Sequence, residues 1–565
     1  MTPAMKIKGS EALIKSLLEE GADTLFGYIG GAIMPVYDAL YDYSDRMKHY
    51  LMRHEQGAIH ATQAYSRVTG KTGVCFATSG PGATNIVTGL ADAQLDSTPL
   101  ICITGQVHSA LLGTDAFQEQ DMISISMPVT KWNFQITKPE EIGPAIAKAF
   151  YVAGSGRPGP VLIDFTKDAQ MAELEFSYEK CTGIRSYFPI PKIDHNQAQE
   201  AATLINNCQK PLILAGHGTK ISGAQQLLLS FAEKTGIPVS NTLLGLSGFP
   251  QEHPLYVGML GMHGNYGPNI KTNDADLLIA IGMRFDDRVT GDLSRYAINA
   301  KVIHIDIDKS ELSKNVKADI PILADARQAL DTLLPLVQER KHDAWLKEFK
   351  ECQRIENEVV VHNQCYPEGS DPHMGEVARL ISEMTHGEAI IVTDVGQHQM
   401  ITARYYRFAP TSNFITSGGL GTMGFGLPAA FGAAVGAPHK QVIAVIGDGG
   451  FQMTIQELGS YFQHKIPVKI ILLNNNFLGM VRQWQEMFFN KRYSYTEMIN
   501  PDFIAIAKGY HIPGRKITDR SDLPAALQEL LNEPGTRLLE IVVRKEENVM
   551  PMVPAGESVS NIRLT

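Results

Sequence analysis

The sequence lacks the features by which membrane proteins and nucleic-acid-binding proteins are recognised. In its 565 residues the longest apolar runs, such as 442–446, have the length of a strand, far short of the ~20 residues that cross a bilayer. The formal net charge is −10, and the sequence has no basic stripe of the kind that binds phosphate backbones. We therefore expect no membrane partner and no nucleic-acid partner.

Cysteine is also scarce. The six cysteines stand singly at Cys75, Cys102, Cys181, Cys208, Cys352 and Cys365. No pair has the spacing of a metal site or a redox motif, so we expect buried or inert thiols. Residues 1–10 contain two lysines, but they are not followed by the apolar segment of a secretory signal. We expect a cytoplasmic location.

The sequence does contain a repeated pattern of short apolar runs, each followed by a glycine-rich turn and a helix-compatible stretch. Examples of these runs are 74–77, 277–281 and 442–446. Continuous β-branched runs are typical of strands buried on both faces, and such strands belong to parallel sheets covered by helices. We therefore predict an α/β protein built from repeated βα units.

Two stretches interrupt this pattern. Residues 176–194 are polar and proline-bearing without periodicity, and residues 338–372 are highly charged and partly helical. Both are typical of connectors. The sequence therefore predicts three α/β domains, at 1–175, 195–335 and 370–565, and the chain length agrees with several domains rather than one core.

The sharpest motif lies in the last predicted domain. One strand ends at Gly447-Asp448-Gly449-Gly450, and the next ends before Asn475. An interval of about 26 residues is one βαβ crossover, which brings Asp448 and Asn475 to the carboxyl ends of neighbouring parallel strands, where such sheets bind ligands. A G-D-G turn alone is common at strand ends, but this pair at this spacing predicts a metal–diphosphate site.

The chemistry of these residues suits Mg²⁺, which takes oxygen ligands and usually only one or two protein carboxylates. Asp448 supplies charge, Asn475 a neutral oxygen, and a backbone carbonyl near Phe477 a third ligand. The glycines allow the backbone to approach a diphosphate closely, helped by the N-terminus of the following helix. A Walker loop is absent. The G-D-G to N-N spacing resembles that of the thiamine-diphosphate enzyme family.

That resemblance implies a catalytic role for Glu55. Without the resemblance, a lone glutamate would be interpreted as a solvated surface residue. Glu55 matches the residue that touches the aminopyrimidine ring of thiamine diphosphate and helps to remove the thiazolium C2 proton. In the same family Gly31 matches a backbone donor, with Ile29 in place of the usual proline. Met423 matches the apolar residue that holds the cofactor bent, although a methionine can equally fill a core.

Further motifs narrow the family. Arg284 to Gly291 reads R-F-D-D-R-V-T-G, which is very similar to biosynthetic acetohydroxyacid synthases. The segments 113–119, 155–160, 261–264 and 479–484 resemble the same family, so the likeness extends over nearly the whole chain. Through these segments the resemblance places Gln118 among the catalytic residues and Met480 among the cofactor-binding ones. It implies three doubly wound parallel-sheet domains of the thiamine-diphosphate enzyme type.

The resemblance also implies FAD in the central domain. The matching positions are Arg157, Gly216, Gly218, Thr242, Leu243, His263, Gly282, Arg284, Arg288, Asp306 and Asp325. From the residues alone, Asp306 at a strand end offers a carboxylate for a ribose or ribityl hydroxyl. Gly216-His217-Gly218 is not a full G-x-G-x-x-G.

The substrate channel is inferred in the same way. Its matching positions are Phe117, Lys167, Met262, Arg288, Val481, Trp484 and Phe488. Arg288 could bind the carboxylate of the second 2-oxo acid in a bidentate manner, or it could contact FAD or form an internal ion pair. Trp484 matches the residue that favours an ethyl over a methyl group in the acceptor.

The implied activity is decarboxylation of pyruvate and transfer of the hydroxyethyl unit to pyruvate or 2-oxobutyrate, the first common step of valine, leucine and isoleucine biosynthesis. In this family the active site lies between the first domain of one subunit and the third domain of another. This implies a homodimer or homotetramer. The resemblance separately implies a small regulatory subunit as a partner.

Several alternatives remain open. Pyruvate oxidases, glyoxylate carboligases and simple 2-oxo-acid decarboxylases are related thiamine enzymes, although glyoxylate carboligases lack the glutamate found here at position 55. A non-catalytic FAD-bearing scaffold or regulatory subunit is the alternative outside the class. The presence of Glu55, Asp448 and Asn475 disfavours it.

Overall fold

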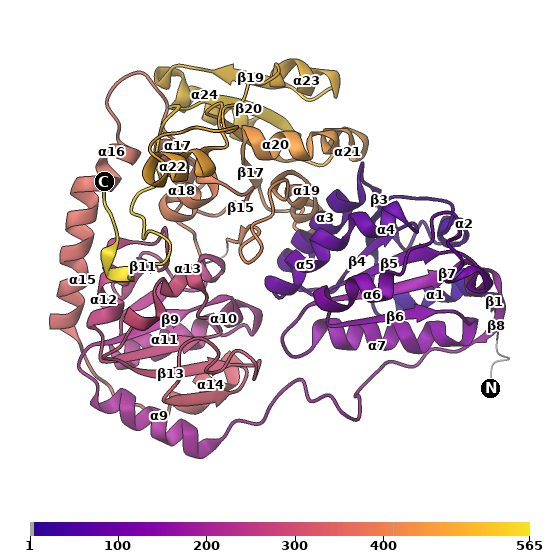
Figure 1. Cartoon of the computed structure of the whole chain (residues 1–565), viewed down its shortest axis with the longest axis horizontal. Coiled ribbons are helices and arrows are strands. Elements are labelled where there is room, and N and C mark those ends of the chain that lie inside the picture. The colour runs from indigo at the N-terminus through magenta and orange to yellow at the C-terminus, as the bar shows by residue number, and fades with distance from the viewer. Residues whose placement is uncertain (1–4, 411) are drawn as a thin grey trace.

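The computed structural model describes residues 5–410 and 412–565. Its main feature is three six-stranded sheets, each with helices packed around it (Figure 1). Every strand pairing within these three sheets is parallel. The predicted α/β class with three parallel-sheet domains is therefore confirmed.

The first sheet has the order β3-β2-β4-β5-β7-β6. Its strands are β2 (Thr24–Gly27), β3 (Lys48–Leu51), β4 (Gly73–Ala77), β5 (Leu100–Gln106), β6 (Trp132–Ile136) and β7 (Pro160–Thr166). Around it lie α1 (Gly9–Glu19), α2 (Met34–Tyr41), α3 (Glu55–Thr69), α4 (Pro81–Asn85), α5 (Val87–Leu95), α6 (Met122–Ser126), α7 (Ile142–Gly154) and α8 (Lys167–Met171). A separate antiparallel pair joins β1 (Met5–Lys8) to β8 (Glu173–Phe176).

The central sheet has the order β11-β10-β9-β12-β13-β14. Its strands are β9 (Pro211–Ala215), β10 (Val239–Asn241), β11 (Tyr256–Met259), β12 (Leu277–Ile281), β13 (Lys301–Asp306) and β14 (Ile320–Leu323). Its helices are α9 (His195–Asn207), α10 (His217–Ile221), α11 (Gln225–Thr235), α12 (Tyr266–Asp274), α13 (Asp287–Thr290) and α14 (Ala326–Leu333). Counted from β9, this is the order 3-2-1-4-5-6 of dinucleotide-binding folds, whose ligands bind where the order reverses, between β9 and β12.

The third sheet has the order β16-β15-β17-β18-β20-β19. Its strands are β15 (Ile390–Thr393), β16 (Phe414–Ile415), β17 (Val442–Gly447), β18 (Lys469–Asn474), β19 (Gly514–Ile517) and β20 (Arg537–Val542). Its helices are α17 (Met374–Met384), α18 (Gln397–Tyr405), α19 (Gly426–Gly436), α20 (Asp448–Met453), α21 (Leu458–His464), α22 (Gly479–Phe488), α23 (Phe503–Gly509) and α24 (Leu523–Asn532). Counted in chain order, the first and third sheets have the same arrangement, which supports an origin by duplication.

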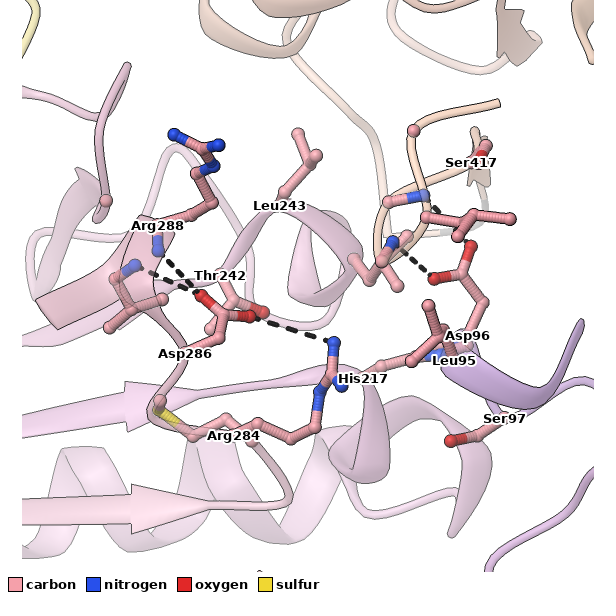
Figure 2. A pocket seen from close by; sticks show the side chains of 18 of the residues that line it. Leu95, Asp96, Ser97, His217, Thr242, Leu243, Arg284, Asp286, Arg288 and Ser417 are labelled. Carbon is pink, nitrogen blue, oxygen red and sulfur yellow. Dashed lines mark hydrogen bonds and ion pairs between the residues drawn. The ribbon is translucent and has the colours of Figure 1, made fainter. Parts of the chain in front are cut away.

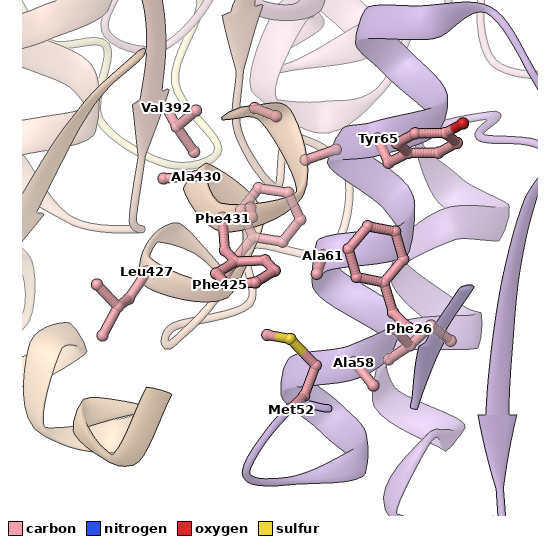
Figure 3. Close-up of a cluster of buried hydrophobic side chains, with 14 of the residues drawn as sticks. Phe26, Met52, Ala58, Ala61, Tyr65, Val392, Phe425, Leu427, Ala430 and Phe431 are labelled. Carbon is pink, nitrogen blue, oxygen red and sulfur yellow. The ribbon is translucent and has the colours of Figure 1, made fainter. Parts of the chain in front are cut away.

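Two helices join the first and third sheets. Helix α19 is apolar on all sides and is almost wholly buried, as expected of a helix with protein on every face. It lies against α3, and a Cβ atom on Gly432 would come within 1.8 Å of the Ala61 carbonyl oxygen. Phe26, Phe425 and Phe431 fill the space around this crossing (Figure 3). A glycine is therefore required where the two helices meet.

The connectors and the last segment tie the domains together. Helices α15 (Asp343–Glu356) and α16 (His362–Cys365) flank a π-helical turn at Asn357–Val361. After β20 the chain returns to the central domain, where the Val553 N–H donates to the Met262 carbonyl at 2.8 Å. The domain limits 1–175, 195–335 and 370–565 stay a proposal, and residues 1–4 lie outside the described part.

The structure bears on two expectations from composition, inert cysteines and no membrane-spanning helix. All six cysteines are free; Cys181 is half-buried and the other five are buried. In the part of the chain that the structure describes, none of the helices combines the length and the apolar character needed to cross a membrane.

Candidate active site

The predicted metal ligands meet at one edge of the third sheet. Asp448 begins α20 directly after β17, and Asn475 directly follows β18, the neighbouring strand. Both side chains are buried. The Asn500 Nδ2 atom donates to Asp448 Oδ2 at 2.7 Å and to Asn474 Oδ1 at 3.0 Å, so a third asparagine links the ends of the two strands.

The oxygen atoms at this edge fit Mg²⁺ held partly by a diphosphate. Among the described residues, no group of three or more His, Cys, Asp or Glu side chains could hold a metal ion by itself. Mg²⁺ does not need such a group, because phosphate oxygens and water complete its shell. Burial raises the pKa of Asp448 to about 6, against the lowering effect of the Asn500 hydrogen bond. A bound cation would offset that burial cost.

The glycines of this turn are also needed by their protein neighbours. A Cβ atom on Gly450 would lie 2.2 Å from Asp394 Oδ1, and one on Gly447 would lie 2.8 Å from His398 Nδ1. A Cβ atom on Gly449 would lie 2.7 Å from the Leu478 side chain. The glycine-rich turn therefore permits close packing of β17 and α20 against β15 and α18, apart from any contact with a ligand.

Glu55 is the first residue of α3 in the first domain. It is buried, and its Oε2 atom accepts a hydrogen bond from Asn85 Nδ2 at 2.9 Å. Gln118 approaches the same region from another side, since a Cβ atom on Gly80 would lie 2.9 Å from its carbonyl oxygen. Gly31 is exposed with open space where a side chain would be. Glu55 and Gln118 thus both border helix α4.

A large pocket of about 820 Å³ lies where the three domains meet. Leu95 and Asp96 reach it from the first domain, and Ser417 from the third, while the central domain supplies Thr242 and Arg284 (Figure 2). The predicted site residues that line it are Arg157, Gly218, Thr242, Leu243, Met262, His263, Gly282, Arg284, Arg288, Asp306, Asp325, Met423, Met480, Val481 and Trp484. The structure therefore brings most of the predicted FAD positions together with the predicted acceptor positions Met262, Arg288, Val481 and Trp484.

This pocket lies at the reversal point of the central sheet. Gly216 follows β9 and Gly282 follows β12, and the Gly218 N–H donates to the Gly282 carbonyl at 2.9 Å. The Nδ1 atoms of His217 and His263 are buried without a hydrogen-bond partner. Both rings border the pocket, but their Nδ1 atoms are shielded from it by protein atoms. The size, fold position and donor set fit a dinucleotide such as FAD.

Charged residues surround the same pocket. Burial raises the pKa of Asp306 at the end of β13 to about 6. Arg157 bridges two domains, because its Nη1 atom lies 3.1 Å from Asp308 Oδ2 and 2.9 Å from Glu311 Oε1. The Arg288 side chain is 61% exposed, which leaves its guanidinium accessible to a ligand.

Other predicted positions do not line this pocket. They are Glu55, Gly31, Gln118, Phe117, Lys167, Gly216, Gly447, Asp448, Gly449, Gly450, Asn475, Phe477 and Phe488. Phe117 is 88% exposed, and Lys167 is exposed at the start of α8. Phe488 contacts Trp484, with ring centroids 5.1 Å apart. Within one chain, the predicted catalytic residues of the first domain therefore do not line the pocket that the predicted acceptor residues of α22 line.

Sequence reasoning missed several residues of this region. Asp96 accepts from the Gly418 and Gly419 N–H groups at 2.9 and 2.7 Å (Figure 2). Gln397 accepts from Asn475 Nδ2 at 3.3 Å. Gln397 begins the helix after β15, at the reversal point of the third sheet, and this position could have identified it. No motif or strand-end position in the sequence points to Asn500.

Comparison with known proteins defines the class first. Models of the thiamine pyrophosphate enzyme domains match three parts of the chain: the N-terminal TPP binding domain residues 7–125, the central domain residues 198–333, and the C-terminal TPP binding domain residues 394–541. The chain therefore has the three domains of a thiamine pyrophosphate enzyme, as the sequence motifs predicted.

Individual relatives narrow the class. The acetolactate synthase large subunit of Corynebacterium glutamicum is 44% identical over 577 residues, which cover 99% of this chain and 90% of that protein. The corresponding subunit of Lactococcus lactis is 45% identical, covering 97% and 94%. Isozyme 2 of Escherichia coli is 44% identical, covering 98% and 99%. This chain belongs to the acetolactate synthase large subunit family.

Proposed function

We propose that this chain is the catalytic subunit of an acetolactate synthase. It decarboxylates pyruvate and transfers the two-carbon unit to a second pyruvate or to 2-oxobutyrate. The observation that carries the proposal is the single pocket lined both by the reversal point of the central sheet and by Met480, Val481 and Trp484 on α22. Helix α22 begins four residues after Asn475, so acceptor and cofactor would be held by one continuous segment.

The proposed cofactors are thiamine diphosphate, Mg²⁺ and FAD. When bound, thiamine diphosphate supplies the electron sink that allows a 2-oxo acid to lose carbon dioxide. Asp448, Asn475 and the carbonyl of Phe477 would hold Mg²⁺, and Gly447, Gly449 and Gly450 would lie against the diphosphate. The apolar side chains of Met423 and Met480 would support the cofactor. The central domain residues named in the sequence analysis would bind FAD in the large pocket.

The remaining roles belong to side chains around the reacting atoms. Glu55 would hold and return a proton at the aminopyrimidine ring, and Gly31 and Gln118 would contact the cofactor or substrate beside it. Arg288 would bind the carboxylate of the acceptor, since a guanidinium can form two parallel hydrogen bonds with it. Phe117, Lys167, Met262, Val481 and Phe488 would line the access channel and exclude water.

Trp484→Leu should reduce the preference for 2-oxobutyrate over pyruvate by roughly 1–3 kcal/mol, the worth of a methylene-scale contact in an apolar pocket. The larger indole fills space that a leucine leaves open, so the ethyl group would lose part of its contact. The measurement is the ratio of 2-aceto-2-hydroxybutyrate to 2-acetolactate when both acceptors compete.

Trp132→Leu is the matched control for this variant. Trp132 is half-buried on β6, stacks on Phe134 with ring centroids 5.6 Å apart, and does not line the large pocket. It should leave the product ratio unchanged. An unchanged ratio in Trp484→Leu as well would remove the proposed specificity role.

We further propose that the working unit is at least a homodimer, as a dimer or tetramer, with a small regulatory subunit as an additional partner. Glu55 does not line the pocket that the acceptor residues of its own chain line, which supports a site completed by a second copy. The expected cytoplasmic location stays a prediction that fractionation of cells would test.

Co-expression of Glu55→Gln and Asp448→Asn chains should restore activity to ~25% of the wild type, because random pairing makes half the dimers mixed and each mixed dimer contains one intact site of two. At a Mg²⁺ concentration just sufficient for the wild type, each variant expressed alone should be nearly inactive. The measurement is specific activity of the co-purified mixture, with a different tag on each chain.

The control for this experiment pairs Asp448→Asn with the double variant Glu55→Gln/Asp448→Asn. This mixture contains no intact site, whether the site is built within one chain or shared between two. Activity of the first mixture no higher than that of this control would mean that each site is built within one chain.

Product identification tests the proposed activity itself. The purified protein is incubated with pyruvate and 2-oxobutyrate, with and without thiamine diphosphate, Mg²⁺ and FAD. Acetolactate and 2-aceto-2-hydroxybutyrate are the expected products. Acetyl phosphate or acetate would indicate a pyruvate oxidase, acetaldehyde a decarboxylase, and no cofactor-dependent release of carbon dioxide a non-catalytic protein.

A further inference from the structure

Arg404 and Glu356 form a buried ion pair next to the large pocket without lining it. The Arg404 side chain is 0% exposed and that of Glu356 is 3% exposed. They come from different parts of the chain, since Glu356 ends the connector helix α15 and Arg404 lies in the last turn of α18 in the third domain. Neither residue is used in the proposed reaction.

The Arg404 guanidinium binds the backbone of a pocket-lining segment, residues 260–264. Its Nη1 atom donates to the His263 carbonyl at 3.2 Å and to the Gly264 carbonyl at 2.8 Å, while Nη2 donates to Glu356 Oε1. The segment belongs to the central domain and lines the large pocket throughout. Arg404 therefore fixes from outside a segment whose other side meets the ligand.

Glu356 holds the next two residues of the same loop. Its Oε1 atom accepts from Asn265 Nδ2 at 2.9 Å, and its Oε2 atom accepts from the Tyr266 N–H at 2.7 Å. Tyr266 is the first residue of α12, and a carboxylate is favourable at a helix N-terminus. The ion pair thus connects α15, α18 and the loop before α12.

Helix α18 also reaches the pocket at its other end. Val395 and Gly396 directly precede it, and they line the pocket together with Gln399 and Met400. One short helix therefore contacts the pocket with its first turns and holds the 260–264 segment with its last turn. A shift of either end would change the width of the pocket.

The charge of Arg404 also acts on His263. Burial lowers the pKa of His263 to about 3, and Arg404 and Arg288 lower it further by repulsion. His263 is therefore neutral near pH 7, with its Nδ1 atom buried and unpaired.

A purely stabilising role accounts poorly for this pair. Buried ion pairs contribute little net stability compared with apolar replacements of similar size, although removing one partner alone is costly. The Arg404 Nε atom has no hydrogen-bond partner, which adds to the cost. We propose that Arg404 and Glu356 are positioning residues that set the place of Met262 and His263 in the FAD and acceptor pocket. This inference rests on the proposed binding of FAD there.

The test compares three variants by FAD affinity, which is measured on apoprotein by quenching of flavin fluorescence and needs no turnover. Arg404→Met should weaken FAD binding by about 10-fold or more, by analogy with the effect of residues that orient metal ligands from behind. Arg404→Lys should weaken it less, because one ammonium group can still reach one carbonyl. The double variant Arg404→Met/Glu356→Met should recover thermal stability relative to Arg404→Met but not FAD affinity.

Arg354→Met is the matched control. Arg354 lies on helix α15, as Glu356 does, and its ion pairs with Glu351 and Glu358 are exposed. It should keep the wild-type FAD affinity and the wild-type product ratio between pyruvate and 2-oxobutyrate.

Wild-type FAD affinity and product ratio in the double variant would overturn the inference, because the pair would then serve stability alone. Should Arg404→Met fail to fold, the FAD affinities of the double variant and of Arg404→Lys test the inference instead. Unchanged FAD affinity in both variants would overturn it. A wild-type protein that does not bind FAD would remove the proposed cofactor, and the inference with it. Binding of FAD without any effect of these variants would remove the inference only.

Discussion

Glu55→Gln is expected to slow turnover by about 10²–10⁴-fold, the usual contribution of a positioned proton transfer. The glutamine has nearly the same shape and can still accept from Asn85, so the start of α3 should keep its structure. Its amide does not ionise, so it cannot exchange a proton with the aminopyrimidine ring as a carboxyl group can. The measurement is steady-state turnover with pyruvate at saturating cofactor, accompanied by a thermal unfolding curve.

The control for Glu55→Gln removes a carboxylate of the same domain that has no proposed role. Glu173 on β8 is exposed and pairs with Lys6 at 2.9 Å. Glu173→Gln should therefore retain wild-type turnover. Near-normal turnover in correctly folded Glu55→Gln would show that the glutamate is not the activating group, and the family resemblance at this position would lose its functional meaning.

Asp448→Asn is expected to raise the Mg²⁺ concentration for half-maximal activity by on the order of 10²-fold, since even residues that only orient metal ligands change affinity 10–100-fold. Asp448 is the one charged side chain among the proposed ligands, and asparagine supplies oxygen without charge. The measurement is a Mg²⁺ titration of activity at fixed thiamine diphosphate.

The same variant should not destabilise the metal-free protein. The pKa of Asp448 is raised from 3.8 to about 6 by burial, so the folded state binds its proton more tightly than the unfolded state. Its contribution to stability therefore decreases as the pH rises from about 4 to about 6 and stays low above that range. Asparagine has no such dependence, so Asp448→Asn should unfold at an equal or higher temperature at pH 7.5 without Mg²⁺.

Asp522→Asn provides the control, because Asp522 is an exposed carboxylate of the same domain, 4.0 Å from Arg515. Neither its Mg²⁺ titration nor its unfolding temperature should differ from the wild type. An unaltered Mg²⁺ requirement in Asp448→Asn would mean that the cation, if needed, binds elsewhere.

Local pattern predicted what depends on a few consecutive residues. Strands such as β4 and β17 are apolar throughout because both of their faces are covered, and that is visible in the sequence. The approach of Asp448 to Asn475 was predictable because a single crossover connects adjacent parallel strands. The position of Glu55 at a helix start was predictable for a similar reason, since a strand and a turn precede it.

The order of the strands in each sheet could not be predicted from the sequence and was seen only in the structure. The likeness of the first and third sheets is hardly visible in their residues, yet both have the same order. The 3-2-1-4-5-6 order of the central sheet supports the proposed dinucleotide site at Gly216 and Gly282 even though the G-x-G-x-x-G motif is incomplete. Strand order depends on pairings between distant segments, and apolar runs of similar composition do not distinguish their neighbours.

By itself, the sequence determined the α/β class and the family, and it predicted the metal–diphosphate edge, because each of these rests on spacing along the chain or on recognisable motifs. Tertiary structure alone decided which residues share a pocket. Asp96 meets the 417–420 loop, Arg404 meets Glu356, and Val553 meets Met262 through contacts between segments far apart in sequence. The physical reason is that such contacts follow from how whole domains pack against one another, and no local periodicity or propensity records that packing.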